Sequence, residues 1–413
     1  MSVGGVEGRN EGLGKGEWDL ITLSKKVEAD LAADIEKNGA YVHPDILKVR
    51  VEGGTKVHFE VKPGAEKASI REKMDRYVDA MVSRFRQLPK KILHERKRKD
   101  SGELGRGVYD ELKRRGWVVE LGRGQVALKG PAMNLLRAVD EDCKERIGLD
   151  AFNAQEEVYP TLIPAKTLGR CGYFSSFPQS VSMVTHLVED YDRIEHFRQA
   201  NANTTDLTVP DVTAFTTPEA CLSPAVCYHC YRSLEGQTLK NDANVVTTVG
   251  KCFRYESTNI TGLDRLWDFT MREVIFVGTE EQVSTRRQKG IDLVMEQLDR
   301  WDLECQVETA NDPFFSAAYA TKTYYQVRGD LKYELRLTVE PGAAGEARSL
   351  ACGSFNLHEN FFGKTMSITA SDGQPAFTGC VAWGLERWVL ACFTQHGFDP
   401  SRWPADVRAR VFK

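Results

Sequence analysis

Two cysteines and a histidine lie within four positions in the stretch LSPAVCYHCYRSL, residues 222–234. The spacing of Cys227 and Cys230 is that of a redox dithiol or of half a structural zinc site. It is also compatible with some other arrangement, because spacing alone does not identify the partner of a thiol. The partner of Cys227 therefore has to be sought in the rest of the chain.

A second segment that can do chemistry is KCFRYESTNITGLDRLWDFTMREVIFVG, residues 251–278, whose flanks alternate as two strands joined by a polar loop. Arg254 and Glu256 would share one face of the first strand, where both charges are costly to bury unpaired. A nucleotide would satisfy them, because the guanidinium can bind a phosphate and the carboxylate can accept from an adenine amino group. Phe269 on the returning strand would stack on the base. Taken alone, the segment would be better explained as a salt-bridged surface hairpin.

A third segment, FTGCVAWGLERWVLACFT, residues 377–394, runs from an apolar strand through Gly384 into an apolar helix. Arg387 lies at that junction, among apolar residues, where its guanidinium could bind a buried anion. Together, the second and third segments resemble motifs 2 and 3 of the class II aminoacyl-tRNA synthetases. EEVYPTLIPAKTL, residues 156–168, resembles the degenerate motif 1, which builds the dimer interface in that class.

Further motifs narrow the resemblance: CLSPAVCYHCY, FTMREVIFVG, NDPFF (residues 311–315), SFNLHENFFG and TGCVAWGLER. With these, residues 131–413 resemble the amino acid:[carrier protein] ligases, which are themselves similar to the catalytic core of methanogen-type seryl-tRNA synthetases. The resemblance implies an active-site zinc ion held by Cys227, Glu273 and Cys380, with the fourth position open for the amino group of the substrate. Cys230 would then be a packed thiol and His229 a local hydrogen-bonding residue, although a redox pair stays open.

Other residues are assigned less directly. Asn356 matches a position near the amino acid and ATP in these relatives, and it could equally cap a turn. Glu334 could help to hold magnesium or could pair with Lys332, so the magnesium ligands stay open. The sequence departs from the family in three places. Ala382 stands where glycine is common, and the loop STNITGLDRLW (residues 257–267) is closer to that of the seryl enzymes. In addition, about 110 residues precede the core.

The elements that position these residues fall into three parts: a glycine-rich flexible tail at 1–20, an appended basic α+β domain at 21–130 and a catalytic domain at 131–413. The appended part contains a helix near 24–38, a hairpin turning at Gly53-Gly54, and a helix over 67–88 that Pro89 ends. Residues 107–130 predict a helix followed by a short hairpin, and a further helix begins at Gly130-Pro131. Between Arg84 and Arg115, twelve basic residues face five acidic ones. This run is either a solvated surface or a docking face for a polyanion, either tRNA or an acidic protein.

Composition limits the remaining choices. The 413 residues carry a net charge of −4, with 41% hydrophobic and 28% charged residues, as in ordinary globular proteins. No apolar run is long enough to span a membrane and the N-terminus has no signal-like core, so we expect a cytoplasmic protein with reduced cysteines. Ten cysteines in such a chain are buried thiols or metal ligands rather than a disulfide framework.

The predicted fold is α+β: a class II synthetase core, with an antiparallel sheet flanked by helices, and a small α+β N-terminal domain. The predicted function is ATP-dependent activation of glycine, alanine or serine as an aminoacyl-adenylate, with transfer to the phosphopantetheine thiol of a holo carrier protein. The resemblance further implies one Zn²⁺ per subunit, Mg²⁺ with ATP, and a homodimer. The alternatives are seryl-type aminoacylation of tRNA, transfer to a small metabolite, and a non-catalytic binding paralogue. The sequence does not identify the amino acid, the acceptor or the role of residues 21–130.

Overall fold

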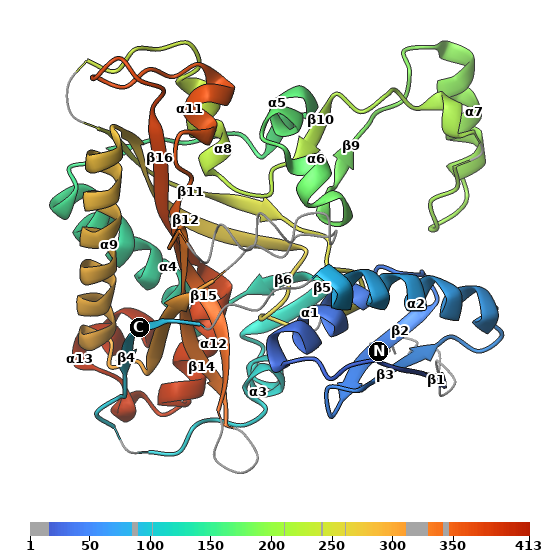
Figure 1. The fold of residues 1–413 in the computed structure, drawn as a ribbon, viewed down its shortest axis with the longest axis horizontal. Coiled ribbons are helices and arrows are strands. Elements are labelled where there is room, and N and C mark those ends of the chain that lie inside the picture. Colours follow the sequence, from blue (N-terminus) through green and yellow to red (C-terminus); the bar gives the residue numbers. More distant parts are fainter. Residues whose placement is uncertain are drawn as a thin grey trace, which may run out of the picture. The chain divides into compact units, whose positions relative to one another are not determined.

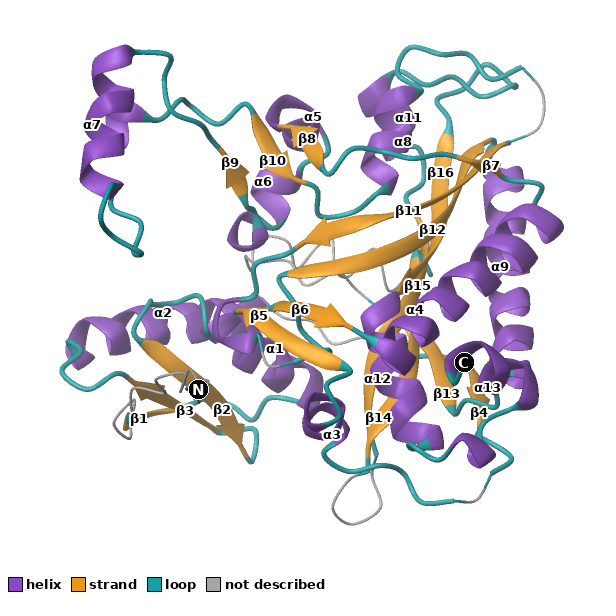
Figure 2. Ribbon diagram, turned by 180° about the vertical axis from the view of Figure 1, so that it is seen from behind, coloured by secondary structure: helices purple, strands orange, loops and turns teal. Residues whose placement is uncertain are grey.

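The computed structural model describes residues 16–84, 90–100, 102–209, 211–240, 243–260, 262–310, 329–341 and 347–413. Most of the expected tail and the NDPFF stretch lie outside these ranges. The chain divides into two compact units (Figures 1 and 2). The N-terminal unit holds residues 16–84 together with Glu256–Ile260, and the core unit holds the other described residues from Lys90 on. No described helix combines the length and the apolar character needed to cross a membrane.

The N-terminal unit is a three-stranded antiparallel sheet, in the order β1-β3-β2, with two helices. Its elements are β1 (Glu17–Thr22), α1 (Ala29–Gly39), β2 (Ile46–Glu52), β3 (Lys56–Val61) and α2 (Lys67–Arg84). The hairpin expected at Gly53-Gly54 is confirmed: Glu52 pairs with Lys56 across a three-residue loop, in which both glycines have positive φ, of 58° and 69°, and the N–H of Thr55 bonds to the carbonyl of Glu52 at 3.1 Å. Strand β1 was not foreseen.

The core unit is built on an eight-stranded sheet in the order β4-β13-β14-β15-β16-β12-β11-β7, among the described residues. All neighbouring pairs are antiparallel except β7 with β11. The strands are β4 (Ile92–Arg96), β13 (Cys305–Thr309), β14 (Lys332–Glu340), β15 (Arg348–Leu357), β16 (Phe377–Gly384), β12 (Asp268–Gly278), β11 (Asn244–Phe253) and β7 (Gln155–Glu156). This is the helix-flanked antiparallel sheet that the sequence predicted.

Other described residues of the core unit form two smaller sheets, β8-β10-β9 and the hairpin β5-β6. Their strands are β8 (Leu162–Pro164), β10 (Ala220–Leu222), β9 (Met183–Val184), β5 (Val118–Gly122) and β6 (Gln125–Leu128). The helices are α3 (Val108–Arg114), α4 (Gly130–Asp142, continued by a π-helix over Cys143–Ala151), α5 (Ala165–Arg170), α6 (Tyr173–Ser176), α7 (Tyr191–Asn201), α8 (Cys227–Ser233), α9 (Glu280–Arg300), α11 (Phe361–Met366), α12 (Leu385–His396) and α13 (Ala405–Val411).

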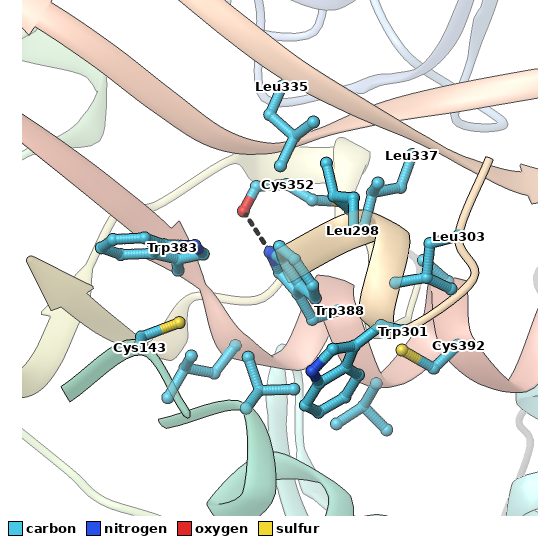
Figure 3. Close-up of a cluster of buried hydrophobic side chains, with 14 of the residues drawn as sticks. Cys143, Leu298, Trp301, Leu303, Leu335, Leu337, Cys352, Trp383, Trp388 and Cys392 are labelled. Atoms are coloured by element: carbon cyan, nitrogen blue, oxygen red, sulfur yellow. Dashed lines mark hydrogen bonds between the residues drawn. The ribbon is translucent and has the colours of Figure 1, made fainter. Parts of the chain in front are cut away.

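The two faces of the large sheet have different characters. Alternate residues such as Phe355, Val381 and Trp383 join the large apolar cluster formed with α4, α9 and α12. In Figure 3, Trp388 of α12 lies in this cluster beside Trp301, and its indole N–H donates to the carbonyl of Cys352 at 3.1 Å. The opposite face carries the polar residues of the candidate site.

The boundary between the two units lies at a different position from the domain boundary that the sequence predicted. Residues 90–130 belong to the core unit, because β4 pairs with β13 and because α3 and β5 contribute Val108, Leu112 and Val118 to the large apolar cluster. The boundary therefore lies before Lys90 rather than at residue 130. A local pattern does not show this, since β4 pairs with a strand more than 200 positions away and the ring of Trp117 contacts that of Phe393, 276 positions away.

Candidate functional site

Three side chains that can bind a metal converge from three elements of the core unit. Cys227 opens α8, Glu273 lies in β12 and Cys380 in β16. Ile275 pairs directly with Cys380, so Glu273, two residues before Ile275, points to the same face of the sheet. The ligand atoms of the three residues all lie within 4.8 Å of one another, and the residues are only 6%, 1% and 2% exposed.

The electrostatics of this group favour a cation. The backbone N–H of Cys227 donates to Oε1 of Glu273 at 3.4 Å, whereas Oε2 of Glu273 is buried and has no partner among the described residues. Hydrogen bonding to Cys380 and burial raise the pKa of Cys227, and burial raises the pKa of Glu273. Three potentially anionic groups packed this closely stay protonated unless a cation is supplied. Two thiols and one carboxylate are a donor set that suits Zn²⁺.

Cys230 and His229 are not part of this group. Cys230 is fully buried in an apolar cluster with Tyr231 and Phe362, and burial raises its pKa to about 12. His229 is buried and stacks on Tyr159, with ring centroids 5.8 Å apart. All ten cysteines are free, so Cys227 and Cys230 form no disulfide, and Cys230 is not in the group of metal-binding side chains found among the described residues.

Arg254 lies just after β11, not within it. The prediction that Arg254 and Glu256 lie on the strand is wrong, because β11 ends at Phe253. The N–H of Arg254 still bonds to the carbonyl of Trp267 at 3.0 Å, but the N–H of Tyr255 turns to the carbonyl of Ser180 at 3.2 Å. The guanidinium of Arg254 donates through Nε to the carbonyl of Pro224 at 3.0 Å. It also lies 5.4 Å from the centroid of the Phe269 ring.

Glu256 is grouped differently from the other predicted site residues. It precedes the 3₁₀ turn Ser257–Asn259 and opens the short segment Glu256–Ile260, which belongs to the N-terminal unit. In that unit the side chain of Asn259 donates to the carbonyl of Lys37 at 2.8 Å. Glu256 lies beyond the end of β11 and is not a strand residue.

Arg387 stands in the first turn of α12, and the predicted passage from strand through Gly384 to helix is confirmed. Its guanidinium donates to the carbonyls of Asp264 and Ala351, each at 2.7 Å, so backbone groups fix its direction. Glu386 beside it is 4% exposed and accepts from the N–H and the hydroxyl of Thr270 at 2.7–2.9 Å. Glu386 therefore ties α12 to β12. Sequence reasoning gave it no role, although a glutamate inside an apolar run was a signal.

A polar row crosses the sheet from the candidate metal group. Residues paired directly across the strands share a face, and this row reads Glu308, Glu334, Ser354, Ala382, Glu273 and Thr248. Glu334 lies 3.3 Å from Lys332, which fits the ion pair considered as the alternative to a magnesium ligand. Asn356 is directly opposite Cys380 and donates to its sulfur at 3.3 Å. The sequence gave no sign of this contact, and the role of Asn356 near the amino acid and ATP stays a prediction.

The basic run between Arg84 and Arg115 is largely neutralised within the core unit. Arg96 pairs with Asp302 at 2.8 Å, and Lys99 with Asp299 at 3.1 Å. The other pairs are Lys90 with Glu308, Lys91 with Asp330, Lys97 with Glu304, Arg98 with Asp100, Lys113 with Asp110 and Glu120, and both Arg114 and Arg115 with Glu111. The run is mostly an ion-paired surface, which favours the first of the two readings drawn from the sequence.

Comparisons with known proteins add to this geometry. No family model matches the chain. Amino acid–[acyl-carrier-protein] ligases 1 and 2 of Bradyrhizobium diazoefficiens are each 33% identical, over 255 and 277 residues. The matches span 60% and 66% of this chain and 74% and 80% of those relatives. The type-2 serine–tRNA ligase of Methanocaldococcus jannaschii is 26% identical over 330 residues, 79% of this chain but only 63% of that protein.

Solved structures bear on the fold. The Methanopyrus kandleri seryl-tRNA synthetase in a complex with Aquifex aeolicus tRNASec matches 95% of this chain and 76% of its own, with a TM-score of 0.69 and 24% identity. A serine–tRNA ligase from Naegleria fowleri bound to AMP matches 84% of this chain, with a TM-score of 0.57 and 12% identity. At these identities the likeness concerns the fold alone, and it confirms the predicted class II architecture.

Proposed function

The chain belongs to the amino acid–[acyl-carrier-protein] ligase family, and from that premise we propose that it activates a small amino acid with ATP and passes it to the phosphopantetheine thiol of a carrier protein. The observation that carries the proposal is the buried group of Cys227, Glu273 and Cys380 on one face of a class II sheet. Glycine, alanine and serine are the expected substrates. A pocket built around a bound amine leaves little room for a large side chain.

We propose that Cys227, Glu273 and Cys380 hold one Zn²⁺ per subunit. The unpartnered Oε2 of Glu273 and the shared burial of the three residues support this assignment. When bound, the ion would offer a Lewis-acid position for the substrate's amino group. Cys230 takes no part, because it is not among the side chains whose ligand atoms lie within 4.8 Å of one another.

Two arginines serve the adenylation step. A carboxylate oxygen of the amino acid attacks the α-phosphorus of ATP, a new O–P bond forms, and the bond to the leaving pyrophosphate, carried with Mg²⁺, breaks. Arg254 and Arg387 stabilise the charge that develops on the phosphates. Both guanidiniums are already fixed by backbone carbonyls, so little reorganisation is needed at the moment of reaction. Phe269 stacks on the adenine, and the assignment of Glu256 to its amino group rests on the sequence motif.

In the second step the carrier thiol attacks the carbonyl carbon of the aminoacyl-adenylate. A thioester forms, AMP leaves and the thiol proton passes to solvent. A homodimer formed through residues 156–168 and a cytoplasmic location complete the proposal. Both of these rest on the sequence, the first on the resemblance to motif 1.

The second candidate is aminoacylation of tRNA with serine. It is favoured by the longer match to the type-2 serine–tRNA ligases, which extends over 79% of this chain. The described residues of the basic run are mostly paired with carboxylates, so this run does not favour tRNA over an acidic carrier protein. The small-metabolite acceptor and the non-catalytic paralogue have no observation in their favour.

The test is to incubate the pure protein with ATP, Mg²⁺, Zn²⁺ and radiolabelled glycine, alanine or serine. Holo carrier protein, apo carrier protein and bulk tRNA are offered in parallel. Label on the holo carrier alone, released by mild thiol treatment, is the expected result. Label on tRNA would replace the proposal by the second candidate. No exchange of pyrophosphate into ATP with any of the three amino acids would contradict the enzyme assignment itself.

A further inference from the structure

The candidate metal group has a polar neighbour on β15 that fixes one of its ligands. Asn356 pairs directly across the sheet with Cys380, so the two side chains lie side by side on one face. Nδ2 of Asn356 donates to Sγ of Cys380 at 3.3 Å and to the hydroxyl oxygen of Ser354 at 3.0 Å. Ser354 lies two residues earlier on the same strand and on the same face.

These two contacts account for the donor capacity of the amide. A carboxamide has two N–H bonds, and here one meets a sulfur and the other a hydroxyl oxygen. The nitrogen is therefore committed to the protein, and only the carbonyl oxygen Oδ1 is left as an acceptor. A direct donor role toward an ATP phosphate, which needs an N–H, would require breaking one of these bonds.

The other side of the metal group is held in a comparable way. There, the backbone N–H of Cys227 meets Oε1 of Glu273 at 3.4 Å. Two of the three proposed ligands thus accept a hydrogen bond: Cys380 from Asn356, which lies outside the group, and Glu273 from the backbone of Cys227, within it. Such outer contacts set the direction of a ligand atom and favour its anionic, metal-binding form.

We propose that Asn356 is a positioning residue that holds the sulfur of Cys380 toward the bound metal, with Ser354 locking the orientation of its amide. This proposal rests on the proposed function, because it presupposes a metal at Cys227, Glu273 and Cys380. It assigns Asn356 to the support of a ligand rather than to direct recognition of ATP.

The experiment compares full-length wild type with Asn356→Leu and Asn356→Asp, which remove the donor, the second with little change in shape. The dissociation constant for Zn²⁺ is measured by competition with a chromogenic chelator. The sulfur-to-cobalt charge-transfer band is recorded after Co²⁺ loading. We expect Zn²⁺ to bind about 10- to 100-fold more weakly in both variants, with a shifted or weakened cobalt band.

A matched control is Asn134→Leu, because Asn134 also donates through Nδ2, at 3.0 Å to the carbonyl of Val411, but does so on α4. It should leave Zn²⁺ affinity unchanged even if it lowers stability. If the Asn356 variants do not fold, Ser354→Ala is the alternative test. It removes only the hydroxyl that accepts from the amide of Asn356, and it should weaken Zn²⁺ binding without altering the sheet.

Different results would overturn different claims. Zn²⁺ affinity within twofold of wild type in the Asn356 variants would overturn the positioning role. Unchanged affinity together with a raised KM for ATP would return Asn356 to direct substrate contact. If wild type itself bound neither Zn²⁺ nor Co²⁺, the proposed metal site would fail, whatever the variants did.

Discussion

A truncation series tests where the catalytic core begins. One fragment starts at residue 90, the boundary in the structure, and the other at residue 131, the boundary expected from the sequence. We predict that residues 90–413 fold and that residues 131–413 do not. The difference lies in α3, β4 and the β5-β6 hairpin, which pack within the core unit.

The size of the effect follows from three side chains. Val108, Leu112 and Val118 are 4%, 0% and 2% exposed and belong to the large apolar cluster. Burying a valine or leucine stabilises a fold by about 1.5–3 kcal/mol, so losing all three removes roughly 5–9 kcal/mol. A whole domain is stable by only about 5–15 kcal/mol. Without β4, strand β13 also loses the strand that pairs with its outer edge, and Asp302 loses its ion pair with Arg96.

Thermal denaturation followed by circular dichroism measures the outcome. Residues 90–413 should show one cooperative transition, and residues 131–413 should be unfolded or insoluble at 25 °C. Leu112→Ala within residues 90–413 is an internal scale, expected to cost about 2–5 kcal/mol. The reasoning fails if residues 131–413 melt within a few degrees of residues 90–413, since the three side chains would then contribute nothing to the core.

Three further predictions concern single residues. Arg254→Lys should lower kcat/KM for ATP in pyrophosphate exchange by about 10²–10³, because the planar guanidinium that can bind a phosphate through two hydrogen bonds is lost. Arg106→Lys, at an arginine with no ion pair to the described residues, should have no effect, and equal activities of the two variants would contradict the phosphate role of Arg254. Cys380→Ser should abolish the bound zinc measured by mass spectrometry, and Cys230→Ser should retain it; the opposite pattern would revive the Cys-x-x-Cys site. Burial lowers the pKa of His396 from 6.5 to about 4. The unfolded chain therefore takes up the proton first, and the free energy of unfolding should fall by up to about 3 kcal/mol as the pH drops from 6.5 to 4. His396→Gln should flatten this slope in urea titrations, and an unchanged slope would show that another group is responsible.

Local patterns were sufficient wherever the determining contacts are local. The hairpin at Gly53-Gly54 follows from alternation and from glycine in a tight turn, and the helix after Gly384 follows from an apolar run. The end of β11 does not follow from such a pattern. Alternation continues through Arg254 to Glu256, but the N–H of Tyr255 bonds to Ser180, 75 positions earlier, and takes the chain out of the sheet.

The candidate metal group illustrates the same limit more sharply. Spacing pointed from Cys227 to Cys230, which is three residues away but lies outside the converging metal-binding group. The residues that meet Cys227 lie on β12 and β16, and the register that pairs Ile275 with Cys380 brings them together. Only the resemblance to a family connected Glu273 and Cys380 to Cys227, because no local rule joins residues 46 and 153 positions apart.

The basic run shows how the same limit bears on the acceptor. Composition records the sign of a charge but not its partner, and here the partners Asp299, Asp302, Glu304 and Glu308 lie about 200 residues downstream. A tRNA docking on this surface would have to displace those carboxylates from Lys90, Lys97 and Lys99, so each phosphate contact would cost an existing ion pair. Phosphate binding gains its strength from released counterions, and a lysine already paired with a carboxylate has fewer to release. A weak and shallow salt dependence of tRNA binding follows, and an acidic carrier protein meets the same obstacle. We therefore expect the surface that selects the acceptor to lie outside the paired residues of this run.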